Sequence, residues 1–246
     1  MMKKIMWVIS GIALFGTMAT LPFLPNSVPM HYDISGNIDR WGSKYENLIF
    51  PIIIIAMSIF WTIMINNYEK KARAAAGGTE LVGAGAAADT ENKEAAGAQT
   101  NAKVVGIVGV TMASVFAVMH GFIIYGEYTA AVAKTETQTI DMGRIGFILI
   151  GIMMIVLGNI MTKTRANRYV GVRVKWSMYN DNTWRKSNRF GAVAFMIAGV
   201  LVVILTLFLK ENAILATAFS GIIIGTSVIT IIYSYFVYTK EIQEGR

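Results

Sequence analysis

Residues 158–191, GNIMTKTRANRYVGVRVKWSMYNDNTWRKSNRFG, lie between two apolar segments and decide how the chain is arranged. The stretch carries eight basic residues against a single acid, Asp181. Loops with an excess of Lys and Arg between two membrane spans stay on the cytoplasmic side of the bilayer. The stretch therefore predicts a membrane protein with this loop in the cytoplasm. Its basic residues are Lys163, Arg165, Arg168, Arg173, Lys175, Arg185, Lys186 and Arg189.

The composition of the whole chain agrees with a membrane protein. Of the 246 residues, 54% are hydrophobic and only 15% are charged. The apolar residues gather in blocks of about 20, the length at which a helix crosses a hydrocarbon core of about 30 Å. Cysteine is absent, which excludes disulfides and thiol chemistry. We attribute the net charge of +7 to topology and to anionic lipid, and expect no direct binding to nucleic acid.

These blocks predict an all-α, polytopic integral membrane protein with six transmembrane helices and cytoplasmic N- and C-termini. Six helices place both termini on one side, and 17 of the 22 Lys and Arg residues then lie there, which identifies the cytoplasm. The first apolar segment is longer than the ~7–15-residue core of a cleaved signal peptide, so we expect it to be retained. The expected helices are residues 5–24, 48–65, 103–125, 144–162, 191–209 and 214–238.

The chain divides into three regions by composition. Residues 1–66 form an N-terminal two-helix unit with an extracellular motif loop at residues 25–47. Residues 67–102 are rich in Ala and Gly, and beyond a short extension of the second helix we expect a flexible cytoplasmic linker. Residues 103–246 form a four-helix region that contains a basic cytoplasmic loop at residues 163–190.

Two patterns of small residues predict close contacts between helices, because small side chains let two helix backbones approach each other in lipid. The pattern in the third helix is Gly109, Ala113, Ala117 and Gly121. The pattern in the sixth helix is Gly221-x-x-x-Gly225.

The sequence carries no recognisable catalytic constellation. The motifs HExxH, Walker A and G-x-S-x-G are absent, so we expect neither an enzyme nor a resident cofactor. The expected helix interiors hold few ionisable residues, whereas ion-coupled transporters usually bury several. A small-molecule or ion transporter stays open as an alternative.

Both histidines, His31 and His120, are expected at the outer side of the membrane. In the plain interpretation, His31 makes hydrogen bonds within its loop and His120 makes them between helices. In the other interpretation, the two share an outer site with Asp39 or Glu127 that binds Zn²⁺ or titrates near neutral pH.

The basic loop also allows two interpretations. Its Lys and Arg residues fix the topology and contact lipid phosphates, or they form a docking surface together with Trp176 and Trp184. The two tryptophans are eight residues apart, which places them near one face if the segment is helical.

The basic loop resembles the signature of the SdpI family of bacterial membrane proteins, and the first loop resembles the small domain of unknown function that commonly precedes it. Val174-Lys175 stands where the family often has Thr-Pro, and Ser177 stands where Thr is common. The positions that match in the basic loop are Gly158, Asn159, Lys163, Asn167, Gly171, Val172, Arg173, Trp176, Ser177, Trp184, Arg185, Lys186 and Arg189. Those in the first loop are Leu24, Pro25, Pro29, His31, Gly36, Asp39, Gly42, Ser43 and Lys44.

This resemblance implies a multi-pass protein of the bacterial cytoplasmic membrane that protects its host from a secreted, membrane-active peptide toxin. It also implies a receptor that holds a cytosolic, ArsR-like autorepressor at the membrane. We expect the toxin to meet the outer motif, which is Pro29, His31, Gly36, Asp39, Trp41, Gly42 and Lys44. We expect the repressor to meet the inner motif, which is Asn159, Lys163, Arg165, Asn167, Gly171, Arg173, Trp176, Trp184, Arg185 and Arg189.

The charge asymmetry yields a direct test of topology. Ser35→Cys and Asn182→Cys, made separately in this cysteine-free chain, place a thiol in the first loop or in the basic loop. In intact cells an impermeant maleimide should label the first variant, and the second only after the cells are opened. Labelling of both from outside would contradict the predicted topology.

Overall fold

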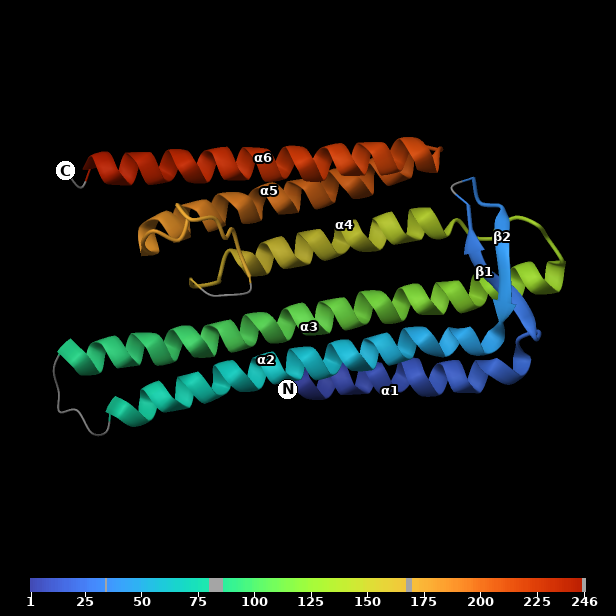
Figure 1. The fold of residues 1–246 in the computed structure, drawn as a ribbon, viewed down its shortest axis with the longest axis horizontal. Coiled ribbons are helices and arrows are strands. Elements are labelled where there is room, and N and C mark those ends of the chain that lie inside the picture. The colour runs from blue at the N-terminus through green and yellow to red at the C-terminus, as the bar shows by residue number, and fades with distance from the viewer. Residues whose placement is uncertain (34, 80–85, 167–169, 245–246) are drawn as a thin grey trace.

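The computed structural model describes residues 1–33, 35–79, 86–166 and 170–244. Within these ranges six helices are long and apolar enough to cross a membrane, which confirms the predicted all-α polytopic class. The helices run along one common axis (Figure 1). They are α1 (Met2–Thr20), α2 (Ile49–Thr79), α3 (Ala86–Ala133), α4 (Met142–Met161), α5 (Asp181–Phe208) and α6 (Asn212–Glu244).

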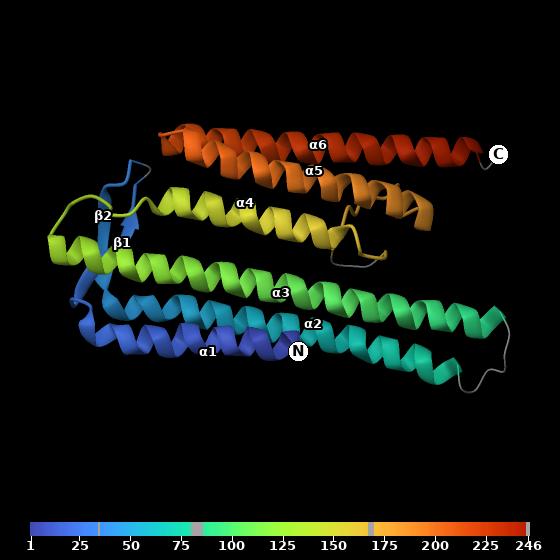
Figure 2. The same ribbon diagram turned by 180° about the vertical axis from the view of Figure 1, so that it is seen from behind.

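The helices form two groups, α1–α3 and α4–α6, which meet where α4 packs against α3. The two views from opposite sides show the groups as parallel layers (Figures 1 and 2). A β-hairpin closes one end of the bundle, and the α4–α5 connection and the carboxyl terminus lie at the other. We call the hairpin end the outer end and the opposite end the inner end, after the predicted topology.

The first loop, residues 25–47, contains a β-hairpin. Strand β1 (Ser27–Tyr32) pairs antiparallel with β2 (Ile38–Ser43), with irregular register around His31. Short 3₁₀ helices, η1 (Leu21–Phe23) and η2 (Lys44–Leu48), connect the hairpin to α1 and α2. Alternating turn residues and β-formers over so few positions give a weak periodic signal, so the strands were not predicted.

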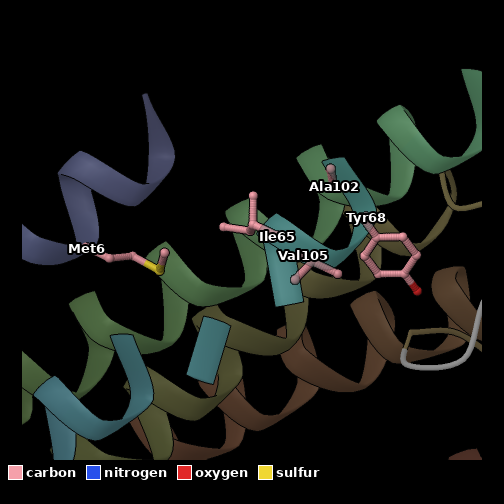
Figure 3. Packing of buried hydrophobic residues seen from close by; sticks show 5 residues of the cluster. All are labelled: Met6, Ile65, Tyr68, Ala102 and Val105. Atoms are coloured by element: carbon pink, nitrogen blue, oxygen red, sulfur yellow. The ribbon is translucent and has the colours of Figure 1, made fainter. Parts of the chain in front are cut away.

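A cluster of apolar side chains joins α1, α2 and α3 on their inner half (Figure 3). Met6 of α1 is fully buried, and Ile65 and Val105 pack in the same cluster. Beside it, the Nζ of Lys3 donates to the Asn66 Oδ1 at 3.0 Å and forms an ion pair with Glu69 at 2.8 Å. The start of α1 is thereby fixed to α2 by both apolar and polar contacts.

The predicted flexible linker is wrong for the residues that the structure describes. Helix α2 continues to Thr79 and α3 begins at Ala86, while residues 80–85 of that segment lie outside the description. Alanine has the highest intrinsic helix propensity, so an Ala-rich polar segment extends a helix that the membrane has already nucleated. At ~1.5 Å per residue, the 48 residues of α3 span about 72 Å, far beyond a hydrocarbon core of about 30 Å. The division of the chain into three regions stays a prediction.

Glycines set the close approach of α4 and α5. An added Cβ at Gly199 would lie 2.6 Å from the backbone oxygen of Gly151, and one at Gly158 would lie 2.7 Å from the Ala192 oxygen. In the predicted ladder of α3, Gly109 does pack tightly, against Met6 and Trp61. The pattern in α6 makes no such contact within the chain, because a Cβ at its glycines meets no atom within 4 Å.

The difference between the glycines of the α4–α5 contact and those of α6 predicts different effects of a Gly→Ala substitution on thermal stability. Gly199→Ala should lower the thermal midpoint of the purified protein in detergent, because its new methyl group meets the α4 backbone, at a cost of about 1–3 kcal/mol. Gly221→Ala is the matched control and should leave the midpoint unchanged or raise it, because it only improves helix propensity. Equal midpoints for the two variants would show that the α4–α5 contact is not tight.

Candidate functional site

The hairpin crosses the outer end of the bundle and is fixed to the connection between α3 and α4. The Ile38 amide donates to the Glu136 carbonyl, and the Gln138 amide donates to the Gly36 carbonyl, each at 2.8 Å. Gly36 has φ +87°, and a Cβ there would lie 2.5 Å from the Gln138 side chain. Glycine is therefore required at this predicted motif position by both backbone angle and space.

Polar contacts at the hairpin tip and base hold its shape. At the tip, Asp33 accepts bonds from the Ser35 and Asn37 amides and from the Asn37 side chain, and this last bond is the main reason that the pKa of Asp33 is lowered. At the base, Ser43 and Glu46 form a capping box. Gly42 leaves room there, since a Cβ would meet the side chain of Glu46.

The other five residues of the predicted outer motif belong to the hairpin or to its anchor. The His31 Nδ1 and the Asp39 Oδ1 are 2.6 Å apart, and both side chains are exposed. Trp41 is exposed on β2. Lys44 donates to the Leu24 carbonyl at 3.2 Å, which ties the end of the hairpin to the end of η1, and Pro29 is a buried residue of β1.

Beneath the hairpin lies a cavity of about 470 Å³, which both helix groups line. Apolar walls come from Phe50 of α2, Ile123 of α3 and Phe147 of α4. Two polar side chains form part of the wall although each is only 1% exposed: Asn47 of η2 and Glu127 of α3. The Asn47 Nδ2 donates to the Glu127 Oε2 at 2.6 Å.

The rim of the cavity carries further polar groups. Tyr32 of β1 lines it, and burial raises the pKa of its phenol, with a smaller contribution from Glu127. Asn212, at the start of α6, also lines it and donates to the Asp141 Oδ1 at 3.2 Å. Arg144 pairs with Asp141 at 3.1 Å and donates to carbonyls at the end of α5. It thereby caps that helix and fixes the outer ends of the second helix group.

The structure does not bring the two histidines into contact. His120 is buried in the helix bundle, with its Nε2 2.8 Å from the Thr17 Oγ1 and its ring stacked on Phe50. His31 instead pairs with Asp39 on the hairpin. Among the described residues no group of three or more His, Asp or Glu side chains is placed to hold a metal ion. The shared zinc site stays a prediction, and the described residues supply no third ligand for it.

At the inner end, part of the predicted motif forms the scaffold of the basic loop. Trp184 is 3% exposed and its Nε1 donates to the Thr164 carbonyl at 3.3 Å. Gly171 has φ +116°, and a Cβ there would collide with Trp184 and with the Asn188 Oδ1. Asn188 itself donates to the Met161 carbonyl and to the Thr164 hydroxyl. These residues shape the loop rather than form its surface.

The loop is also fixed to α6. The Trp176 Nε1 donates to the Ser234 hydroxyl at 2.7 Å, and its ring meets Tyr235 edge-on. Asn180 and Asn182 both donate to Glu241 near the end of α6. The eight-residue spacing of Trp176 and Trp184 does not place them on one helical face, because α5 begins only at Asp181.

The remaining inner-motif residues give an exposed basic surface, which we call the inner basic surface and define by Lys163, Arg173, Lys175, Arg185 and Arg189. No ion pair joins any of these five to a described residue. Arg165 lies beside α3, where it donates to the Lys93 carbonyl at 3.4 Å. Asn159 is exposed near the end of α4, and Asn167 lies outside the described residues.

The sequence did not reveal the role of the buried polar residues at the outer and inner ends of the helix bundle. Glu127 was considered only as a partner of the histidines, and Asn47 and Asn188 were not selected at all. The sequence signal for Glu127 is one acid near the end of an apolar segment, which equally fits a residue at the membrane surface.

Comparison with known proteins adds three findings. Residues 163–238 match the SdpI/YfhL protein family, and residues 8–55 match a domain of unknown function, DUF1648. The chain is also similar to the protein named immunity protein SdpI of Bacillus subtilis (strain 168), with 29% identity over 91 residues. That match covers 37% of this chain and 43% of the relative, less than half the length of each. No solved structure matches the chain.

The two matched regions contain the two ends described above: residues 8–55 include the hairpin with Asn47 and Phe50, and residues 163–238 include most of the basic loop with α5. Six helices able to span a membrane join these regions into one multi-pass bacterial membrane protein. From its sequence and its architecture together, the chain is a multi-pass membrane protein whose carboxyl-terminal part is similar to the SdpI/YfhL protein family and whose amino-terminal part is similar to DUF1648.

Proposed function

We propose that this chain is an immunity protein of the bacterial plasma membrane that gives resistance to a secreted, membrane-active peptide. The observation that carries the proposal is the cavity beneath the hairpin, which lies at the outer end and is lined by both helix groups. Similarity to an immunity protein supports the same function.

The cavity has the chemistry that an amphiphilic peptide segment requires. Its volume of about 470 Å³ falls within the ~300–1,000 Å³ that is usual for ligand pockets. Phe50, Ile123 and Phe147 offer an apolar surface, and Asn47 with Glu127 offers polar groups to fix an orientation. The hairpin above it presents Trp41 and the His31–Asp39 pair to the outer solution. A peptide that arrives from outside would meet the hairpin first and the cavity next.

We further propose that the inner basic surface retains a cytosolic autorepressor of the ArsR-like type. Its five basic residues are exposed and carry no ion pair within the described residues, so their charge is available to a partner or to lipid phosphates. Contacts to Trp184 and Ser234 hold the loop backbone in one shape, as a specific docking surface requires.

Two buried groups favour a transporter as the second candidate function. Glu127 and His120 both lie within α3, and such intramembrane ionisable residues often mark ion pathways. Solute or ion flux into liposomes that contain the protein, lost in Glu127→Gln, would favour transport over resistance.

For resistance, the structure predicts which outer substitutions are coupled. A sensitive bacterium that expresses the chain is exposed to graded doses from a panel of secreted membrane-active peptides, and loss of membrane potential is recorded. His31→Ala and Asp39→Ala should each weaken protection, and the double variant should lose little more than either, because the two side chains share one contact of 2.6 Å. For His31→Ala and His120→Ala, the losses of protection should instead be additive in the double variant, because the two histidines contact different partners.

The control for these variants is Lys210→Ala, an outer substitution between α5 and α6 that should leave protection intact. If wild-type cells depolarise at the same peptide dose as cells without the protein, across the whole panel, the chain gives no resistance and the proposal is wrong.

For recruitment, the double variant Arg173→Ala/Arg185→Ala should release a fluorescent candidate repressor from the membrane while protection persists. Both side chains are exposed, so the substitution removes charge without disturbing the loop. Trp176→Ala is a poorer probe, because it also breaks the contact with Ser234. Equal recruitment by wild type and by the double variant would leave these charges only a role in topology and lipid contact.

A further inference from the structure

We propose that the cavity beneath the hairpin binds a primary ammonium group carried by an apolar residue, as at the N-terminus of a peptide that begins with an apolar side chain. This inference rests on the proposed function and names the chemistry that the outer site recognises.

The first observation is a surplus of hydrogen-bond acceptors on the cavity wall. Glu127 presents a carboxylate, of which the Asn47 Nδ2 satisfies one oxygen. The Asn47 Oδ1 is buried and has no hydrogen-bond partner among the described residues, and the same holds for the Asn212 Oδ1. All three residues line the cavity. Buried polar atoms normally find partners, so two orphaned acceptors and one carboxylate in the wall of a single cavity indicate a missing donor.

The second observation is that the nearby cations are already engaged. Arg40, which lines the cavity, pairs with Glu46 at 3.0 Å. Arg144 pairs with Asp141 and donates to the Thr206 and Leu209 carbonyls.

The other groups around the cavity do not supply the missing positive charge either. His31 pairs with Asp39, Lys44 donates to the Leu24 carbonyl, and Asp33 and Tyr32 add no positive charge. Among the described residues, no cation forms an ion pair with Glu127. A buried carboxylate without a cation is costly, and a ligand that brings one removes that cost.

The third observation selects an ammonium over a metal ion. A primary ammonium has three N–H donors and no acceptor, which matches acceptors on Glu127, Asn47 and Asn212. Divalent cations require several oxygen or nitrogen ligands, and no group of three His, Asp or Glu side chains surrounds the site within the described residues.

The apolar walls complete the match. Phe50 and Phe147 line the same cavity and offer contact surface to an alkyl group. The ligand is therefore amphiphilic: a positive group at Asn47 and Glu127, and an apolar body between the helix groups.

The test uses purified full-length protein in detergent and hexylamine as the probe, with calorimetry as the readout. Hexylamine should bind saturably, whereas hexanol, which lacks the charge, and hexyltrimethylammonium, which lacks the N–H donors, should bind at least about tenfold more weakly. Equal binding of the three compounds would overturn the inference. Displacement of hexylamine by stoichiometric ZnCl₂ or MgCl₂ would also overturn it, in favour of a metal site.

Substitutions then locate the site. Glu127→Gln keeps the size of the side chain and should weaken hexylamine binding about tenfold or more, and Asn47→Ala should weaken it severalfold. Glu136→Gln is the matched control, since Glu136 is an exposed outer acid that does not line the cavity, and it should bind as wild type does. Ala216→Phe, which fills the cavity from α6, should abolish binding and covers the case in which Glu127→Gln fails to fold. Wild-type affinity in folded Glu127→Gln or in Ala216→Phe would overturn the assignment.

The same variants separate this inference from the proposed function. If wild type protects cells but discriminates none of the three probes, the ammonium site is wrong and resistance stands. If hexylamine binds as described but wild-type cells gain no protection, the site stands and the function is different. For a peptide against which cells are protected, acetylation of its N-terminus should remove binding; undiminished binding of the acetylated peptide would overturn the peptide part of the inference.

Discussion

Polar groups inside a membrane-spanning bundle must find their partners within the protein, and this constraint organises the N-terminal helix group. Ser10 and Ser58 hydroxyls lie 2.8 Å apart between α1 and α2, and Thr17 meets His120 at 2.8 Å between α1 and α3. Asn47 and Glu127 repeat the arrangement at the outer end, between η2 and α3. Each pair joins two helices at one depth, because neither member has water as an alternative partner. The helix group is therefore held in register by contacts that apolar packing alone would not specify.

The sequence predicted the spanning helices because hydrophobic length is a direct consequence of bilayer thickness. It could not predict which polar residues pair, since Ser10 and Ser58 are 48 positions apart and Asn47 and Glu127 are 80 apart. It also could not separate scaffold from surface in the basic loop, where Trp184 and Gly171 fold the backbone while Arg173 stays exposed. A motif indicates which residues matter, but only their contacts in the structure show whether a residue supports the fold or forms the surface.

The error over the Ala-rich segment has a similar origin. An Ala- and Gly-rich composition without core residues indicates disorder for an isolated segment, but here the segment continues two helices whose apolar parts pack in the bundle. Ala102 and Asn101 are buried on α3, which shows that part of the segment packs against its neighbours. The result is a helical pair that extends past the bilayer on the side of the basic loop, and Arg165 contacts it through the Lys93 carbonyl.

The two ends of the molecule are mechanically connected by the interface between the helix groups. At the outer end, the hairpin is anchored to the α3–α4 connection, and the cavity beneath it is lined by α2 and α3 on one side and by α4 and α6 on the other. At the inner end, the basic loop is held by α6 through Ser234 and Glu241. A ligand that fills the cavity contacts α4 and α6 directly. A change in the distance between α6 and α3 would therefore also displace the part of α6 that holds the basic loop. An outer peptide and an inner regulator would in this way be linked by one rigid element, α6, which has 33 residues and runs from the cavity to the loop without interruption. Coupling of this kind needs a difference in affinity between two arrangements of the helix groups, and the glycine-mediated contact of α4 with α5 joins two of the three helices in the second group.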